Sequence, residues 1–127
     1  MKKSSTVTAI RKLTGAMVGI PPRPIDFRFP ESMPTYFYGG NATATTFFAM
    51  LSGFFPPGER YFMESVRQFR DRVTDDNLRA AISGFMGQEA IHGREHDRLN
   101  ELLAERGFDM KAPDRFVRIG LAILEKL

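Results

Sequence analysis

The sequence predicts an all-α protein in which a helical domain follows an irregular, proline-rich arm. From about residue 41 onward, apolar residues recur with the 3.6-residue period of a helix, and no stretch shows the alternation of a strand. Helix-capping and helix-ending residues punctuate the same region at Asp75 and Gly107. With 127 residues, of which 43% are hydrophobic, the chain has the length of one domain and enough apolar material for a core.

The arm is expected to cover residues 1–40, and the helical domain residues 41–127. Five prolines lie between residues 21 and 34, and each of them disfavours a helix. Residues 28–38 mix Phe, Pro and Tyr, so we expect an extended strap along the domain. Residues 1–30 have a net charge of +5, whereas the whole chain has a net charge of +3, so the remainder is slightly acidic. The arm is read as a solvated leader rather than a nucleic-acid platform, because no aromatic residue precedes Phe27.

Four helical segments are expected in the domain: residues 42–53, 57–73, 76–106 and 113–127. The Pro56-Pro57 pair is expected to interrupt the first two, since proline is tolerated at a helix start but not in its interior. Thr74 or Asp75 would cap the third helix, and Gly107 is a stop signal at its end.

Several classes of protein are excluded by composition. The chain has no cysteine, so disulfide scaffolds and thiolate metal sites are ruled out. No apolar run approaches the ~20 residues of a membrane span, and residues 14–20 are too short and glycine-rich for a signal peptide. A cytoplasmic protein is therefore expected. For metal chemistry the chain offers carboxylates and two histidines.

Three polar residues interrupt the apolar stripe of the long helix. On a helical wheel Glu89, His92 and His96 share one face with the apolar residues Leu78, Ile82, Phe85 and Leu103. A carboxylate in a core is costly unless it is paired or bound to a metal. The stripe therefore indicates either a metal site or a buried Glu–His ion pair that orients two helices.

Glu89 and His92 form a Glu-x-x-His motif, whose two side chains project together from one helix. Dimetal carboxylate bundles use two such motifs with one further Glu from each of two other helices. Glu59 is suited to that further role, because it shares an arc of its wheel with Phe62, Val66 and Phe69. The alternative for Glu59 is a first-turn acid that favours the helix dipole.

A second motif overlaps the first. Residues 92–96 fit H-x-x-E-H, in which two His bind zinc and the Glu activates water. None of the acids after His96 is a persuasive third ligand. Glu95 also lies about 100° from His96 on the wheel, at the wet edge of the stripe. We therefore rank this interpretation below the carboxylate bundle.

The motifs in combination resemble the bacterial predicted metal-dependent hydrolase family. The resemblance covers about residues 28–127 and rests on FPPGERYF at 55–62, SVR at 65–67, GQEAIH at 87–92, Glu95-His96 and Asn100. It implies a ferritin-like fold in which Glu59, Glu89 and His92 bind metal, with His96 as a further ligand or as a partner of one. It also implies members about twice this long, whose later helices add further Glu and His ligands.

The predicted function is that of a metal-dependent hydrolase. A divalent metal (iron, manganese or zinc) would be held by Glu59, Glu89, His92 and His96, with metal-bound water as the nucleophile and Glu95 as the candidate for the base. The substrate would be a small molecule, and nucleic acid is not expected as a partner. A homodimer would supply a second set of ligands. The alternatives are a di-iron oxidase or oxygenase and a truncated, non-catalytic helical interaction module.

Overall fold

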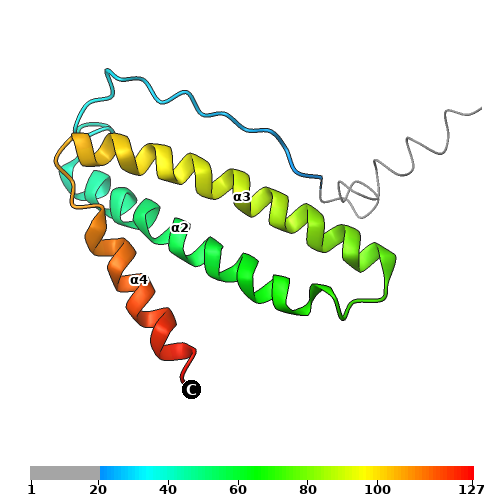
Figure 1. Cartoon of the computed structure of the whole chain (residues 1–127). Helices are drawn as coiled ribbons and strands as arrows, with labels where there is room; N and C mark the ends of the chain where they lie inside the picture. Colours follow the sequence, from blue (N-terminus) through cyan, green and yellow to red (C-terminus); the bar gives the residue numbers. More distant parts are fainter. Residues whose placement is uncertain (1–20) are drawn as a thin grey trace, which may run out of the picture. The chain divides into compact units, whose positions relative to one another are not determined.

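The computed structural model describes residues 21–127, so the expectation of a solvated leader falls largely outside the described residues. Within them the chain forms three helices, α2 (Ala42–Arg70), α3 (Asp76–Glu105) and α4 (Lys111–Leu124), shown in Figure 1. No strand occurs in residues 21–127, and the all-α prediction is confirmed. None of the helices in this range is long and apolar enough to span a membrane.

Helix α2 corrects the expected interruption at the proline pair. It runs for 29 residues without a break and contains both Pro56 and Pro57. Pro56 has no N–H, so it leaves the carbonyl of Ser52, four residues earlier, without its helical donor. The side-chain amide of Asn100 donates to that carbonyl instead, with 3.3 Å between Nδ2 and O. A distant side chain thus replaces the hydrogen bond whose loss was expected to end the helix.

The ends of α3 follow the sequence signals. Asp75 Oδ1 accepts a hydrogen bond from the backbone N–H of Leu78 at 2.7 Å, so Asp75 is the cap. At the other end Gly107 has φ +92°. The N–H of Phe108 donates to the carbonyl of Leu103, and that of Gly107 donates to Ala104. This is the Schellman pattern, and it confirms the predicted stop at Gly107.

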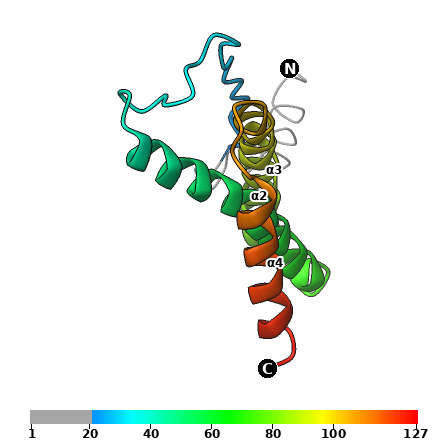
Figure 2. The ribbon, with the colours of Figure 1, turned by 90° about the vertical axis from the view of Figure 1, so that its left-hand side faces the viewer.

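Helix α4 begins at Lys111, two residues before the expected start at Pro113. Asp109 explains the earlier start, since its Oδ1 accepts from the backbone N–H groups of Lys111 and Ala112. The turn that joins α3 to α4 at residues 106–110 is visible in Figure 2.

The chain divides into two compact units, and the division passes through α2 and α3. Among the described residues the first unit comprises 21–25 and 62–92. It contains the end of α2 and the beginning of α3, joined by residues 71–75. Gln88 Nε2 donates to the carbonyl of Pro21, and a Cβ added at Gly87 would lie 2.8 Å from Pro22. Residues 21–25 are therefore held against α3 within this unit.

The second unit comprises residues 26–61 and 93–127, and it contains α4 with the facing parts of α2 and α3. Ala49 and Leu103 are buried in its core. Helices α2 and α4 meet closely, because a Cβ added at Gly53 would lie 2.5 Å from Pro113 Cγ. Only a residue without a side chain fits at this crossing.

Two arginines hold residues 26–33 in this unit, Arg98 of α3 and Arg106, which directly follows α3. Residues 21–30 have no regular secondary structure and residues 31–40 are mostly turns, so the expectation of an extended strap at residues 28–38 is wrong for most of that segment. Arg98 forms an ion pair with Asp26 at 2.6 Å. Arg106 donates to the backbone carbonyls of Glu31 and Met33.

Candidate metal centre

Glu59 is the buried carboxylate of the second unit. Its side chain comes from α2, is 3% exposed, and has both oxygens buried. Gly93 of α3 faces it, since a Cβ added at Gly93 would lie 2.6 Å from Glu59 Oε2. The inward orientation that the helical wheel indicates for Glu59 is confirmed. Gly93 supplies the room that the carboxylate occupies.

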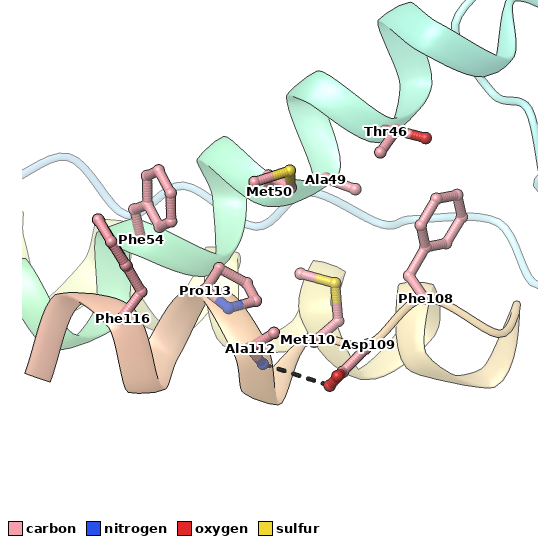
Figure 3. Close-up of a pocket in the computed structure, with 10 residues that line it drawn as sticks. All are labelled: Thr46, Ala49, Met50, Phe54, Phe108, Asp109, Met110, Ala112, Pro113 and Phe116. Atoms are coloured by element: carbon pink, nitrogen blue, oxygen red, sulfur yellow. Dashed lines mark hydrogen bonds between the residues drawn. The ribbon is translucent and has the colours of Figure 1, made fainter. Parts of the chain in front are cut away.

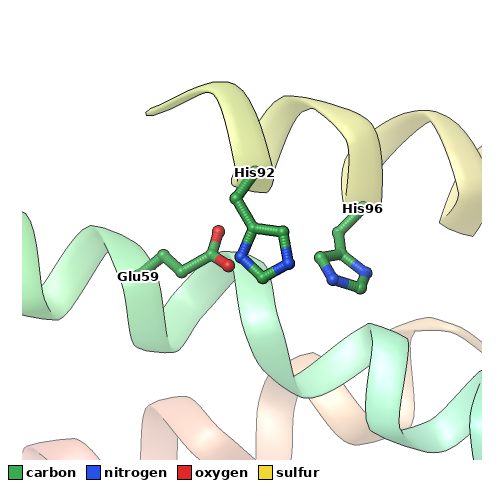
Figure 4. A group of neighbouring side chains, drawn as sticks. All are labelled: Glu59, His92 and His96. Atoms are coloured by element: carbon green, nitrogen blue, oxygen red, sulfur yellow. The ribbon is translucent and has the colours of Figure 1, made fainter. Parts of the chain in front are cut away.

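Two imidazoles from α3 complete a group with Glu59. His92 and His96 lie one turn apart on this helix, and each of the three residues offers a ligand atom within 4.8 Å of the others. Figure 4 shows the Glu59 side chain extending from α2 toward the two rings. His92 is exposed, whereas His96 is half-buried.

The ring of His96 is held from two sides. Phe55 stacks on it with 4.5 Å between ring centroids and 15° between planes. Ser52 Oγ lies 2.8 Å from Nδ1 of His96 and donates to Oδ1 of Asn100 at 2.7 Å. Ser52 was not among the residues that the sequence motifs selected. The sequence feature that could have indicated Ser52 is its position four residues before Pro56. Pro56 has no N–H, so the backbone carbonyl of Ser52 needs a donor from elsewhere in the fold.

The donor set fits a divalent cation. One carboxylate with two imidazoles is a combination that zinc, iron and manganese accept. Ligand atoms around a tetrahedral zinc at about 2.1 Å would stand about 3.4 Å apart. The ligand atoms of Glu59, His92 and His96 lie within 4.8 Å of one another, which is a wider spacing.

Glu89 is the predicted ligand that the group does not include. It lies on α3 one turn before His92 and is partly buried. The group of neighbouring ligand atoms among the described residues comprises Glu59, His92 and His96. Metal ligation by Glu89 therefore stays a prediction.

The expectation that Glu95 lies at the solvent-facing edge of the apolar stripe is wrong. It is 3% exposed, because the chain near Phe27 covers it and the Phe27 N–H donates to its Oε2 at 2.9 Å. Arg94 and Arg98 both donate to Oε1. Burial raises the pKa of the Glu95 carboxyl, but the Phe27 and Arg94 hydrogen bonds and the two arginine charges outweigh it, so the pKa lies below its ordinary value. Its role as a catalytic base stays a prediction.

A separate apolar pocket lies between α2 and α4. It has a volume of about 450 Å³, and its walls include Met50, Phe54, Phe108 and Phe116. Figure 3 shows these side chains around the crossing of the two helices. None of the three residues of the metal-binding group lines it. Phe116 remains 72% exposed at the pocket wall.

Comparison with known proteins identifies a family. A family model described as predicted metal-dependent hydrolase matches residues 21–127. No curated protein matches significantly. No solved structure does so either. Because the match spans all of the described residues and includes Glu59, His92 and His96, the chain belongs to the predicted metal-dependent hydrolase family.

Proposed function

We propose that the protein binds a divalent metal ion through Glu59, His92 and His96 and uses it to hydrolyse a small-molecule substrate. The observation that carries the proposal is the convergence of one carboxylate and two imidazoles within 4.8 Å. Membership of a metal-dependent hydrolase family supports the reaction class.

The three side chains have different tasks in this proposal. Glu59 supplies negative charge from a buried position, where a carboxylate is stable only if a cation or donors compensate it. His96 is immobilised by Phe55 and Ser52, so it presents a fixed ligand atom. His92 is exposed, and its side of the group is where water and substrate would enter. A divalent ion held there would supply a Lewis acid that lowers the pKa of water.

Additional ligands would come from Glu89 or from a second copy of the chain. Two copies provide two Glu59 side chains and two Glu89–His92 pairs, which is the ligand count of dimetal carboxylate bundles. A homodimer with a shared site is therefore part of the proposal.

A second candidate is an iron-dependent oxidase or oxygenase. Two His with one carboxylate and open positions form the donor set of non-haem iron(II) oxygenases, and the group has this composition. The bound metal and its spectrum separate the two reactions.

The first experiment measures metal bound by the purified protein and the melting temperature after adding zinc, manganese or iron(II). Wild type should bind metal and melt at a higher temperature, because a ligand of the folded state stabilises it. Glu59→Gln and His96→Ala should lose both effects. Glu64→Gln is the matched control, since Glu64 is an exposed acid of α2 paired with Arg67. A wild type that binds less than about 0.2 metal per chain and does not change its melting temperature contradicts the proposal.

The second experiment tests the reaction class with metal-loaded protein and a panel of ester, amide and phosphoester substrates. Turnover should depend on added metal and should be lost in Glu59→Gln but not in Glu64→Gln. Tight iron binding with oxygen consumption and no hydrolysis would favour the oxidase instead.

A further inference from the structure

Ser52, Asn100 and His96 form a hydrogen-bonded set within the second unit. Ser52 projects from α2 and is 3% exposed, while His96 and Asn100 lie one turn apart on α3. Ser52 Oγ is 2.8 Å from His96 Nδ1 and 2.7 Å from Asn100 Oδ1. Asn100 Nδ2 is 3.3 Å from the carbonyl oxygen of Ser52. Serine has one hydroxyl proton, so the positions of the protons in this set are constrained.

The orientation of the Asn100 amide comes from the proline in α2. Because Pro56 has no N–H, the Ser52 carbonyl can accept from the Asn100 amide group. The opposite orientation would place Asn100 Oδ1 against this carbonyl, and two acceptors facing each other repel. The amide therefore donates through Nδ2 and presents Oδ1 to the serine hydroxyl.

The proton on His96 follows from the amide orientation. Asn100 Oδ1 has no proton to give, so it accepts the single proton of the Ser52 hydroxyl. Ser52 Oγ then has only lone pairs to offer His96, and Nδ1 must be the donor across the 2.8 Å contact. A neutral imidazole carries one N–H, so its Nε2 keeps the lone pair.

We propose that Ser52 and Asn100 are positioning residues that fix His96 as the Nδ1–H tautomer and leave Nε2 as the metal ligand. The metal-binding part of this inference rests on the proposed function, whereas the tautomer does not. Figure 4 shows one ring nitrogen of His96 directed toward His92. The stacked Phe55 ring holds the imidazole plane, so Ser52 and Phe55 together set both rotation and tautomer. A hydrogen bond from the non-ligating nitrogen is the usual support of a metal-bound histidine.

A nucleophilic role for Ser52 is a different use of the same contacts, and the geometry argues against it. A serine nucleophile gives its proton to the histidine, and the histidine is oriented through its other nitrogen. Here the serine proton goes to Asn100, and the Asn100 amide contacts Ser52. Ser52 is also buried, so a substrate has no access to it. The set therefore supports a ligand histidine.

The decisive measurement is the tautomer of His96 in the metal-free protein, by nitrogen-15 NMR of the imidazole rings at mildly alkaline pH. The chain has two histidines, so in a His92→Gln variant all remaining imidazole signals come from His96. Wild type should show a proton on Nδ1 and none on Nε2. Ser52→Ala and Asn100→Leu should lose this preference and move toward the Nε2–H form of free histidine. Ser83→Ala should change nothing, because the Ser83 hydroxyl donates to the Arg79 carbonyl within α3.

Zinc affinity measured by calorimetry gives the second readout. Ser52→Ala should weaken binding by about 10- to 100-fold, the usual effect of losing a support of a metal ligand. In Asn100→Asp one carboxylate oxygen still accepts the serine proton, so the Nδ1–H tautomer should be retained. The other oxygen faces the Ser52 carbonyl without a proton to donate, so the free energy of unfolding should fall.

The outcomes separate this inference from the proposed function. A proton on Nε2 of His96 in the metal-free wild type overturns the inference, and so does an unchanged tautomer in folded Ser52→Ala. The expected tautomer in a wild type that binds no zinc supports the inference and contradicts the proposed function.

Discussion

Gly93 and Glu59 stand so close that any side chain on Gly93 would occupy the space of the carboxylate. A Cβ at this position would lie 2.6 Å from Glu59 Oε2, at the far end of a side chain that can rotate away. A side chain on Gly93 would therefore displace the carboxylate and have little effect on the stability of the fold.

Gly93→Ala should weaken zinc binding by about tenfold or more, because Glu59 must turn out of the group. The free energy of unfolding should stay level or rise by up to ~1 kcal/mol, since alanine favours a helix over glycine. Gly58→Ala is the matched control, because its Cβ would meet nothing within 4 Å. Calorimetry with zinc and urea unfolding measure the two effects. Equal zinc affinity in Gly93→Ala and wild type would contradict the role of this contact.

Gly53→Ala, in contrast, should lower the free energy of unfolding. Its Cβ would lie 2.5 Å from Pro113 Cγ, so α4 must move away from α2. The expected loss of stability is about 1–3 kcal/mol, as for overpacked cores. Gly120→Ala of α4 meets open space and should not destabilise. Urea unfolding followed by circular dichroism compares the two, and a Gly53→Ala variant as stable as Gly120→Ala would contradict the close crossing.

Glu95 should make the stability of the metal-free protein depend on acid pH. The pKa of its carboxyl is lowered in the folded state, so its stabilising effect is present above the ordinary value of 4.5 and is lost as pH falls through the folded pKa. The groups that face it are Arg94, Arg98 and, through Arg98, Asp26. Wild type should exceed Glu95→Gln in melting temperature at neutral pH, and the difference should shrink below pH 4.5. A difference independent of pH would rule out an ionic role.

Pro56→Ala should change the tautomer of His96 indirectly, through the Ser52 carbonyl and Asn100. The new N–H at position 56 competes with Asn100 for the Ser52 carbonyl, and the amide loses its orientation. Zinc affinity should fall, and the Nδ1–H form of His96 should become less populated. Pro57→Ala removes a ring of the same size from another buried position of α2 and serves as the control. The same response in both variants would show that loss of packing, and not the Ser52 carbonyl, is responsible.

The proposed homodimer should be visible by sedimentation velocity at micromolar concentration. With metal bound, wild type should sediment as a dimer, because the second copy supplies ligands to the shared site. Glu59→Gln should shift the distribution toward monomer. A monomer that still binds metal would contradict the shared site and leave the three-residue group as the complete site.

The two ends of α3 could be predicted because their hydrogen bonds are local. Asp75 and Gly107 act within a few residues of their own positions, so the sequence around them is sufficient. The uninterrupted α2 could not be predicted in this way. The donor that compensates for Pro56 is Asn100, which is 48 residues from Ser52, and no local pattern connects them.

The same distinction applies to the candidate site. A helical wheel gives the direction of a side chain around its axis, and it selected Glu59, His92 and His96. The wheel does not give the position along the axis at which two helices meet, so it did not distinguish Glu89 from these three residues. It also placed Glu95 at a wet edge, because the segment that covers this residue comes from 68 positions away at Phe27.

The unequal exposure of the three ligand residues has a consequence for metal exchange. Glu59 is enclosed, whereas His92 faces solvent. An ion held by the group would therefore enter and leave past His92, and chelators in solution would reach it by the same route. Purification buffers then decide which metal a preparation contains. The metal used in the cell is better identified by rapid capture of the protein from its native cells than by analysis of purified, recombinant material.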